Sequence, residues 1–295
     1  GKYLQLNPNE PRWFNRDRFV LSAGHGSMLL YALFYFLGYP DISIEDIKNF
    51  RQLGAKTAGH PEYGHLNGID MTTGPLGQGI TSAVGMALAE RVINAKFGDE
   101  LCNHYTYVIC GDGCLMEGIS EEAIALAGLW KLNKLIVLWD NNNITIDGTA
   151  DKTNQTNQIE RFKAVGWNTI SINGHDYDEI SAAIETAQQS DKPTLIACKT
   201  VIGYGAPTKS GTSKVHGSPL GEDELDAMKK QFGWEAEPFD TPAEIVAYWR
   251  AASQKSAAQY ARWCEAASGN QQFADYINGV LPPDWDYALK ELKKQ

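Results

Sequence analysis

Two stretches decide the fold: Tyr105-Thr-Tyr-Val-Ile-Cys-Gly-Asp-Gly113 and Leu135-Ile-Val-Leu-Trp-Asp-Asn-Asn-Asn143. In each, an apolar run rich in β-branched and aromatic residues leads into a polar triplet, as buried parallel strands typically do. The segment from Ser120 to Leu132 predicts a helix with Ser120 as its cap and two glutamates in its first turn. We therefore expect a strand–helix–strand unit with Asp112 and Asn142 at the carboxyl edge of the sheet, where α/β proteins bind ligands.

The polar triplets have the chemistry of a magnesium diphosphate site. Mg²⁺ prefers near-octahedral oxygen ligands and takes few of them from protein, the rest coming from phosphate and water. Asp112 offers a carboxylate, Asn142 an amide oxygen, and the following loop a backbone carbonyl. The glycines at 111 and 113 let the backbone approach phosphates closely. Each triplet alone is more typical of a tight turn, but their joint position favours the ligand-binding interpretation.

Further blocks with glycines, histidines or acidic residues surround this unit. Together with Gly-Asp-Gly-Cys-Leu-Met-Glu-Gly-Ile-Ser at 111–120, they follow one another in the order of one enzyme family. On these blocks the chain resembles the thiamine-diphosphate enzymes, and among them the transketolases, from about Asn7 to Trp234. The blocks are Asp17–Leu29, Gly59–Glu62, Thr72–Gly79, Asp140–Gly148, Lys199–Gly205 and Val215–Gly221.

The resemblance implies the N-terminal, diphosphate-binding domain of a transketolase. Strand-like segments at 18–21, 168–172 and 194–201 alternate with helical ones, which predicts an α/β fold: a parallel sheet with helices on both faces. We expect residues 1–234 to form this thiamine-diphosphate domain and residues 235–295 to form a C-terminal helical extension or interdomain linker. The family's first helix, with its Ser-Gly-His-Pro motif, and its later domains have no counterpart in the sequence, so we expect most of one domain of a larger enzyme.

The resemblance implies functional roles for three histidines. It implies that His25, His60 and His216 contact the substrate and move protons, and that His25 and His216 also reach the cofactor. Imidazole suits these tasks because its pKa lies near the working pH and it donates to hydroxyls and phosphates. A lone histidine at a strand end is otherwise more often structural. We expect the histidines without such support on the surface or in the core, namely His65, His104 and His175.

Other cofactor contacts implied by the resemblance come from the backbone. Gly74, Pro75 and Leu76 match the family's contact with the aminopyrimidine ring, although Pro75 alone indicates only the start of a helix. Gly113 matches the residue that donates its amide to the diphosphate. Asn142 matches a residue that touches both phosphate and metal.

The resemblance also implies the metal ligands and an acidic pair. Asp112, Asn142 and the carbonyl of Ile144 match the ligands of Mg²⁺, which Ca²⁺ or Mn²⁺ can replace. Glu117 and Glu122 match acidic residues at the family's dimer interface, where neighbouring carboxylates share protons and have raised pKa values. We count Glu117 among the catalytic residues and Glu122 among the cofactor-binding ones. Without the resemblance, both would be interpreted as charges at a helix start.

The function implied by the resemblance is transfer of a two-carbon ketol unit between sugar phosphates, as in the pentose phosphate pathway. This chain would supply the magnesium-diphosphate half of the site, and a pyrimidine-binding domain of the same or a partner chain in a homodimer would supply the rest. The first alternative is a cofactor-binding subunit or fragment that is inactive without that partner domain. Dihydroxyacetone synthase and deoxyxylulose-phosphate synthase are related alternatives. A nucleotide-binding oxidoreductase is disfavoured because the dinucleotide fingerprint is missing.

Composition excludes some classes of protein. The net charge of −10 argues against a nucleic-acid-binding surface, because phosphate backbones require a basic face. No stretch approaches the ~18 consecutive apolar residues of a membrane span, so we expect no membrane partner. The five cysteines are scattered and odd in number, which suits a reducing cytoplasm better than a disulfide framework.

Overall fold

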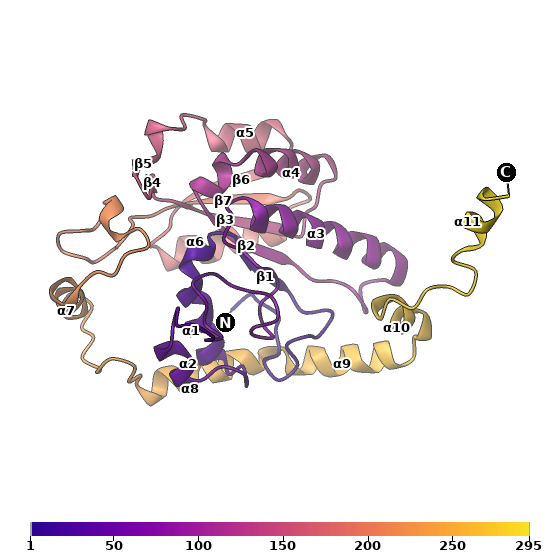
Figure 1. The fold of residues 1–295 in the computed structure, drawn as a ribbon, viewed down its shortest axis with the longest axis horizontal. Helices are drawn as coiled ribbons and strands as arrows, with labels where there is room; N and C mark the ends of the chain where they lie inside the picture. The colour runs from indigo at the N-terminus through magenta and orange to yellow at the C-terminus, as the bar shows by residue number, and fades with distance from the viewer. Residues whose placement is uncertain (1, 295) are drawn as a thin grey trace.

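A five-stranded parallel sheet forms the centre of the molecule, as the sequence predicts. The computed structural model describes residues 2–294, and its sheet has the strand order β1-β2-β3-β7-β6 (Figure 1). All four pairings in this sheet are parallel. The strands are β1 (Arg18–Leu21), β2 (Thr106–Gly111), β3 (Leu135–Asn141), β6 (Asn168–Asn173) and β7 (Thr194–Lys199).

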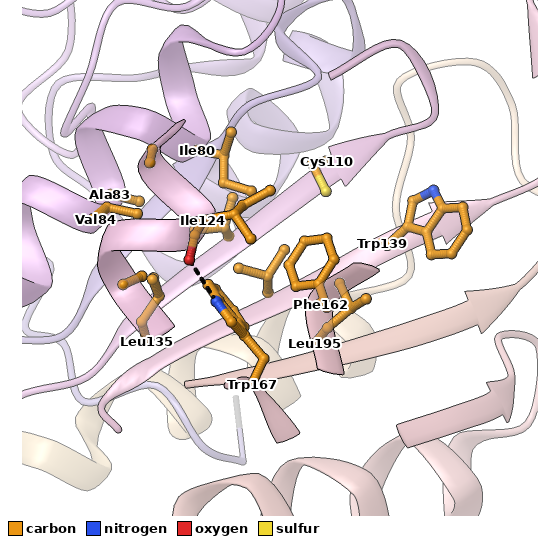
Figure 2. Packing of buried hydrophobic residues seen from close by; sticks show 14 of the residues in the cluster. Ile80, Ala83, Val84, Cys110, Ile124, Leu135, Trp139, Phe162, Trp167 and Leu195 are labelled. Carbon is orange, nitrogen blue, oxygen red and sulfur yellow. Dashed lines mark hydrogen bonds between the residues drawn. The ribbon is translucent and has the colours of Figure 1, made fainter. Parts of the chain in front are cut away.

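Alternating side chains of the strands build two cores, one on each face of the sheet. On β3, Leu135, Val137 and Trp139 enter one core, while Ile136 packs in the other. The first core is shown in Figure 2, where Trp167 donates its indole N–H to the carbonyl of Ile124 at 2.8 Å. The helices of this face are α3 (Gln78–Phe97), α4 (Gly118–Leu129) and α5 (Gln158–Ala164).

The opposite face is covered by α1 (Ser27–Leu37) and α6 (Tyr177–Gln188). The prediction of helices on both faces is therefore confirmed. A short helix, α2 (Ile44–Lys48), follows α1 and has Ser43 as its N-terminal cap. Ser43 accepts from the amide of Asp46, and the Asp46 carboxylate accepts from the amide of Ser43, so that two end groups of the helix are satisfied reciprocally.

Several predicted boundaries were wrong. Helix α4 begins at Gly118 with Glu117 at its cap position, not at Ser120. The Ser120 hydroxyl instead donates to the carbonyl of Cys114 at 2.6 Å and ties the helix to a 3-10 turn, η2 (Gly113–Met116). Helix α5 and a hairpin of β4 (Ile144–Thr145) with β5 (Gly148–Thr149) were not expected from the sequence.

Residues after the sheet form α7 (Glu222–Gln231), α8 (Ala243–Ser253), α9 (Ala257–Ser268), α10 (Gln271–Ile277) and α11 (Tyr287–Leu292). The 3-10 turn η5 (Gln254–Ser256) separates α8 from α9. Helices α9 and α10 pack against the sheet domain: the Trp263 indole of α9 donates to the carbonyl of Leu101 at 3.0 Å, and Phe273 of α10 is fully buried. No helix within residues 2–294 has the length and apolarity to cross a membrane.

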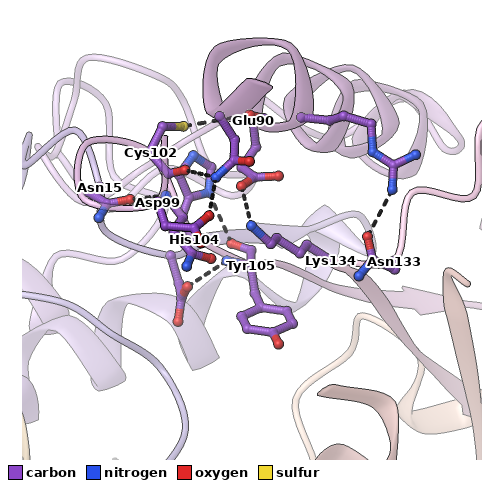
Figure 3. A network of polar contacts seen from close by, with 12 residues as sticks. Asn15, Glu90, Asp99, Cys102, His104, Tyr105, Asn133 and Lys134 are labelled. Atoms are coloured by element: carbon purple, nitrogen blue, oxygen red, sulfur yellow. Dashed lines mark hydrogen bonds and ion pairs between the residues drawn. The ribbon is translucent and has the colours of Figure 1, made fainter. Parts of the chain in front are cut away.

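A polar network closes the amino-terminal edge of the sheet (Figure 3). The Asn15 side chain accepts from the amide of Asn103 at 2.5 Å, and Lys134 pairs with Glu90 at 2.5 Å. His104 is 4% exposed in this region, and burial together with the nearby Arg18 lowers its pKa to about 3. His104 is therefore a neutral core residue, and the core is one of the two locations expected for it.

Candidate functional site

The carboxyl edge of the sheet holds a cavity of about 850 Å³. It forms there because β2 and β3 pair in register up to Gly111 and Asp140, so the polar loops that follow both strands emerge side by side. Ten of the residues expected at the site line this cavity: His25, His60, Gly74, Leu76, Asp112, Gly113, Glu117, Asn142, Ile144 and His216.

Asp112 has an unused ligand atom. Its carboxylate is 9% exposed, and Oδ1 accepts from the Trp139 indole N–H at 3.0 Å. Its Oδ2 atom is buried and has no hydrogen-bond partner within residues 2–294. Burial raises the pKa of Asp112, and the hydrogen bonds from Trp139 and the Asn143 amide oppose that rise. A buried carboxylate oxygen without a donor is costly, and a bound cation removes that cost. The residue therefore fits a metal ligand.

Asn142 is held in one orientation by its neighbours. Its Nδ2 donates to Asp140 Oδ2 at 3.0 Å, and its Oδ1 accepts from the Ile144 amide at 2.8 Å. Thr200 donates to the other oxygen of Asp140 and fixes that carboxylate. An amide oxygen has two lone pairs, so Oδ1 of Asn142 retains one for a metal.

These oxygen donors form a sparse set. Within residues 2–294, no group of three or more His, Cys, Asp or Glu side chains is arranged to hold a metal ion. The expected donors are instead one carboxylate (Asp112), one amide oxygen (Asn142) and one backbone carbonyl (Ile144). This set suits a hard cation such as Mg²⁺, which keeps phosphate oxygens and waters as its remaining ligands.

The histidines converge from separate loops. His25 belongs to the 3-10 turn η1 (Gly24–Gly26) after β1, and His216 follows the 3-10 turn η4 (Ser213–Val215). Their rings stack with centroids 4.7 Å apart and planes inclined by 29°. Burial lowers the pKa of His25, and the proximity of His216 and His60 lowers it further. His25 is therefore neutral near pH 7 and carries both a donor and an acceptor nitrogen.

Missing side chains at two glycines shape the cavity wall. A Cβ on Gly74, which has φ +151°, would lie 3.3 Å from Cγ of His60. A Cβ on Gly113 would lie 2.8 Å from Cδ1 of Leu76. Glycine at these two positions lets the loop before α3 closely approach both the loop of His60 and the turn after β2.

Not every expected residue reaches the cavity. Pro75 is exposed and does not line it, although its neighbours Gly74 and Leu76 do. Glu122 is exposed on α4 and also lies outside the cavity, whereas Glu117 lies on its lining.

Four charged residues of the lining were not among the expected site residues: Arg51, Asp140, Asp147 and Lys152. Asp140 carried a usable signal, because it stands at the end of a strand beside the asparagine triplet. Arg51 lies in the long loop that carries His60, and Lys152 follows the unexpected hairpin. Neither position has a local sequence pattern that marks it.

Comparison with known proteins agrees with this geometry. The family model described as "Transketolase, thiamine diphosphate binding domain" matches residues 1–279. The chain belongs to the transketolase family. It is 55% identical to the transketolase of Cereibacter sphaeroides over 89% of this chain and 40% of that relative. It is 50% identical to transketolase 2 of Vibrio parahaemolyticus over 98% of this chain and 45% of that relative.

Solved transketolases have the same fold. The Campylobacter jejuni enzyme superposes with a TM-score of 0.90 at 43% identity, covering 97% of this chain and 45% of that chain. The transketolase of Pichia stipitis in complex with sedoheptulose 7-phosphate gives a TM-score of 0.90 at 40% identity, covering 97% and 44%. The chain thus spans less than half the length of the transketolases it matches.

Proposed function

We propose that this chain supplies the magnesium-diphosphate half of a transketolase active site, and that the complete site transfers a two-carbon ketol unit between sugar phosphates. One observation carries the proposal: a single cavity brings Asp112, Asn142 and Ile144 together with the three histidines His25, His60 and His216. Metal donors and proton-transfer groups in one cavity are what diphosphate-dependent ketol transfer requires.

Thiamine diphosphate, when bound, supplies a carbon nucleophile and an electron sink. In the proposal, Asp112, Asn142 and the Ile144 carbonyl would hold the metal, which would compensate the charge of the diphosphate. The Gly113 amide donates to a phosphate oxygen, and Gly74 and Leu76 form the wall toward the pyrimidine ring. Mg²⁺ is the proposed metal, and Ca²⁺ or Mn²⁺ share its preference for oxygen ligands.

The histidines bind the sugar in this proposal. His25, neutral at pH 7, donates to one oxygen and accepts from another. His216 is stacked on it and orients it, and His60 reaches the same cavity from a separate loop. The complex of the Pichia stipitis enzyme with sedoheptulose 7-phosphate supports a sugar phosphate as the substrate class.

The chain covers less than half the length of the matched transketolases, which supports an activity that depends on a partner domain. The matched transketolases are more than twice as long, and we propose that a pyrimidine-binding domain, from the same polypeptide or from the second subunit of a homodimer, completes the site. Glu117 and Glu122 then belong to the interface. Residues 1–234 are the proposed cofactor domain and 235–295 the proposed linker. We expect the isolated chain to show no xylulose 5-phosphate-dependent turnover. Turnover by the purified chain would favour a self-sufficient enzyme instead.

A cytoplasmic location follows from the proposed activity. All five cysteines are free, and four of them are buried. Free, buried cysteines are typical of proteins in reducing compartments.

The deciding experiment is calorimetric titration of thiamine diphosphate into the 295-residue chain with and without Mg²⁺. We expect binding that requires Mg²⁺ in the wild type and loses this requirement, together with most of its affinity, in Asp112→Ala. Asp191→Ala removes an exposed carboxylate outside the cavity and should behave as the wild type. Equal affinity of the wild type and Asp112→Ala would contradict the proposal.

A further inference from the structure

Lys152 is a cation of the cavity without a partner. Its side chain lines the cavity, yet no carboxylate oxygen within residues 2–294 lies within 4.0 Å of its Nζ. Nor does the ammonium donate a hydrogen bond to any described residue. Lys163 on α5, by contrast, pairs with Glu160 at 2.8 Å.

The chain path places Lys152 beside the metal donors. Ile144 pairs with Thr149 across the β4–β5 hairpin, and the Ala150 amide donates to the carbonyl of Asn143 at 3.0 Å. The hairpin therefore folds back onto the loop that carries Asn142, and the 3-10 turn η3 (Ala150–Lys152) follows at once.

Two further contacts fix the position of this turn. The Thr153 hydroxyl lies 4.0 Å from the Met116 sulfur, which belongs to the turn that begins with Gly113. A Cβ on Gly148, which has φ +141°, would lie only 2.6 Å from Nζ of Lys152. The missing side chain at 148 thus provides the space in which the ammonium lies. Lys152 is bracketed by the two segments that carry the proposed diphosphate contacts.

The net charge of the cavity indicates a function for the Lys152 ammonium. Four carboxylates, Asp112, Glu117, Asp140 and Asp147, face two permanent cations, Arg51 and Lys152, which gives a formal charge of −2 with neutral histidines. A diphosphate that enters an acidic cavity is repelled unless cations compensate its charge. Mg²⁺ provides part of that compensation, and an ammonium is a suitable second point charge for phosphate.

We propose that Lys152 donates to the diphosphate of the bound cofactor and acts as a second cation beside the metal. This inference rests on the proposed function, since it assumes that a magnesium diphosphate occupies the Asp112 side of the cavity. Arg51 is the less suitable cation for this role, because its guanidinium packs against Gly59 on the loop of His60, with Nε 3.2 Å from a Cβ built there.

The test is calorimetric titration of the full chain at fixed Mg²⁺ with two probes, thiamine diphosphate and inorganic pyrophosphate. The variants are Lys152→Gln, Lys152→Arg and the matched control Lys163→Gln, which removes the same charge from an exposed site outside the cavity. We expect Lys152→Gln to weaken both probes about three- to tenfold, and to do so less at high salt. Lys152→Arg and Lys163→Gln should bind as the wild type does. Melting temperatures should be unchanged, because Lys152 is exposed.

Three results would overturn the inference: unchanged affinity in Lys152→Gln, equal losses in Lys152→Gln and Lys163→Gln, or a loss confined to thiamine diphosphate. The last would place the contact away from the phosphates. In each of these cases the Mg²⁺ requirement and its loss in Asp112→Ala would persist, leaving the proposed function intact. Absence of Mg²⁺-dependent binding in the wild type would contradict both.

Discussion

Replacing Trp139 with phenylalanine tests whether the buried indole positions the proposed metal ligand. Trp139 is 7% exposed, and its N–H donates to Oδ1 of Asp112 at 3.0 Å. Phenylalanine keeps most of the ring in the core but removes the donor. Both oxygens of the Asp112 side chain then lack a side-chain donor, because Oδ2 already has no partner within residues 2–294.

The expected magnitude follows from the charge of the acceptor. A hydrogen bond to a charged group contributes about 1.5–3 kcal/mol, and loss of a group that orients a metal ligand weakens metal affinity about 10–100-fold. A hundredfold change corresponds to about 2.7 kcal/mol, so the two estimates agree. We therefore expect Trp139→Phe to raise the Kd for magnesium thiamine diphosphate at least tenfold, alongside a moderate loss of stability.

Trp167→Phe is the matched control. Trp167 lies in the same core, is 4% exposed, and donates its indole N–H at 2.8 Å to the carbonyl of Ile124, which, unlike Asp112, does not line the cavity (Figure 2). Both variants should lose stability in urea titrations, and only Trp139→Phe should lose cofactor affinity in calorimetry at a temperature where both are folded. Equal affinity in the two variants would refute the positioning role of the indole.

Three further predictions test the packing and the electrostatics. Gly113→Ala places a Cβ 2.8 Å from the flexible end of Leu76, so we expect roughly tenfold weaker cofactor binding in calorimetry with a stability change below about 1 kcal/mol. Unaltered binding would show that the cavity adapts. Gly128→Ala places a Cβ 1.7 Å from a backbone carbonyl oxygen and should lower stability by about 3 kcal/mol in urea, whereas Gly85→Ala meets no neighbour and should be neutral or stabilising. A stable Gly128→Ala protein would contradict the packing of α4. His104 has a folded pKa of about 3, well below that of a free imidazole, so the unfolded state takes up its proton first. The stability it contributes is complete above about pH 6.5 and falls toward pH 3 by up to about 1.4 kcal/mol per pH unit. Urea titrations from pH 7.5 to 5 should show this slope, and His104→Gln should flatten it; identical slopes would contradict a buried neutral imidazole.

The sheet was predictable because the local sequence of each of its two central strands is typical of a buried parallel strand. The apolar runs before Asp112 and Asn142 are continuous, as both faces of a covered parallel strand require, and polar residues end them at the edge where parallel strands open toward a ligand. Those two residues lie at adjacent strand ends in one register, so their presence in one cavity followed from local pattern and topology alone.

Residues whose position depends on tertiary contacts were not predictable in this way. Ser120 has a good capping side chain, but its hydroxyl bonds to the carbonyl of Cys114 in the preceding turn, and the helix begins earlier. Lys152 reaches the cavity only because the β4–β5 hairpin folds back onto the Asn142 loop. The two strands of that hairpin have two residues each, which is too short to show an alternating hydrophobic pattern in the sequence. The stacking of His25 on His216 likewise joins loops that are distant in the sequence.

The charges of the cavity lead us to expect that metal and diphosphate bind as a pair. A diphosphate without metal meets the carboxylates of Asp112 and Asp140, and a metal without diphosphate finds only one carboxylate among its expected donors. Each ligand therefore raises the affinity for the other, and by linkage the two enhancements must be equal. Lys152 is proposed to contact the phosphate and not the metal. Its removal should therefore weaken diphosphate binding without weakening the intrinsic affinity of the donors for Mg²⁺.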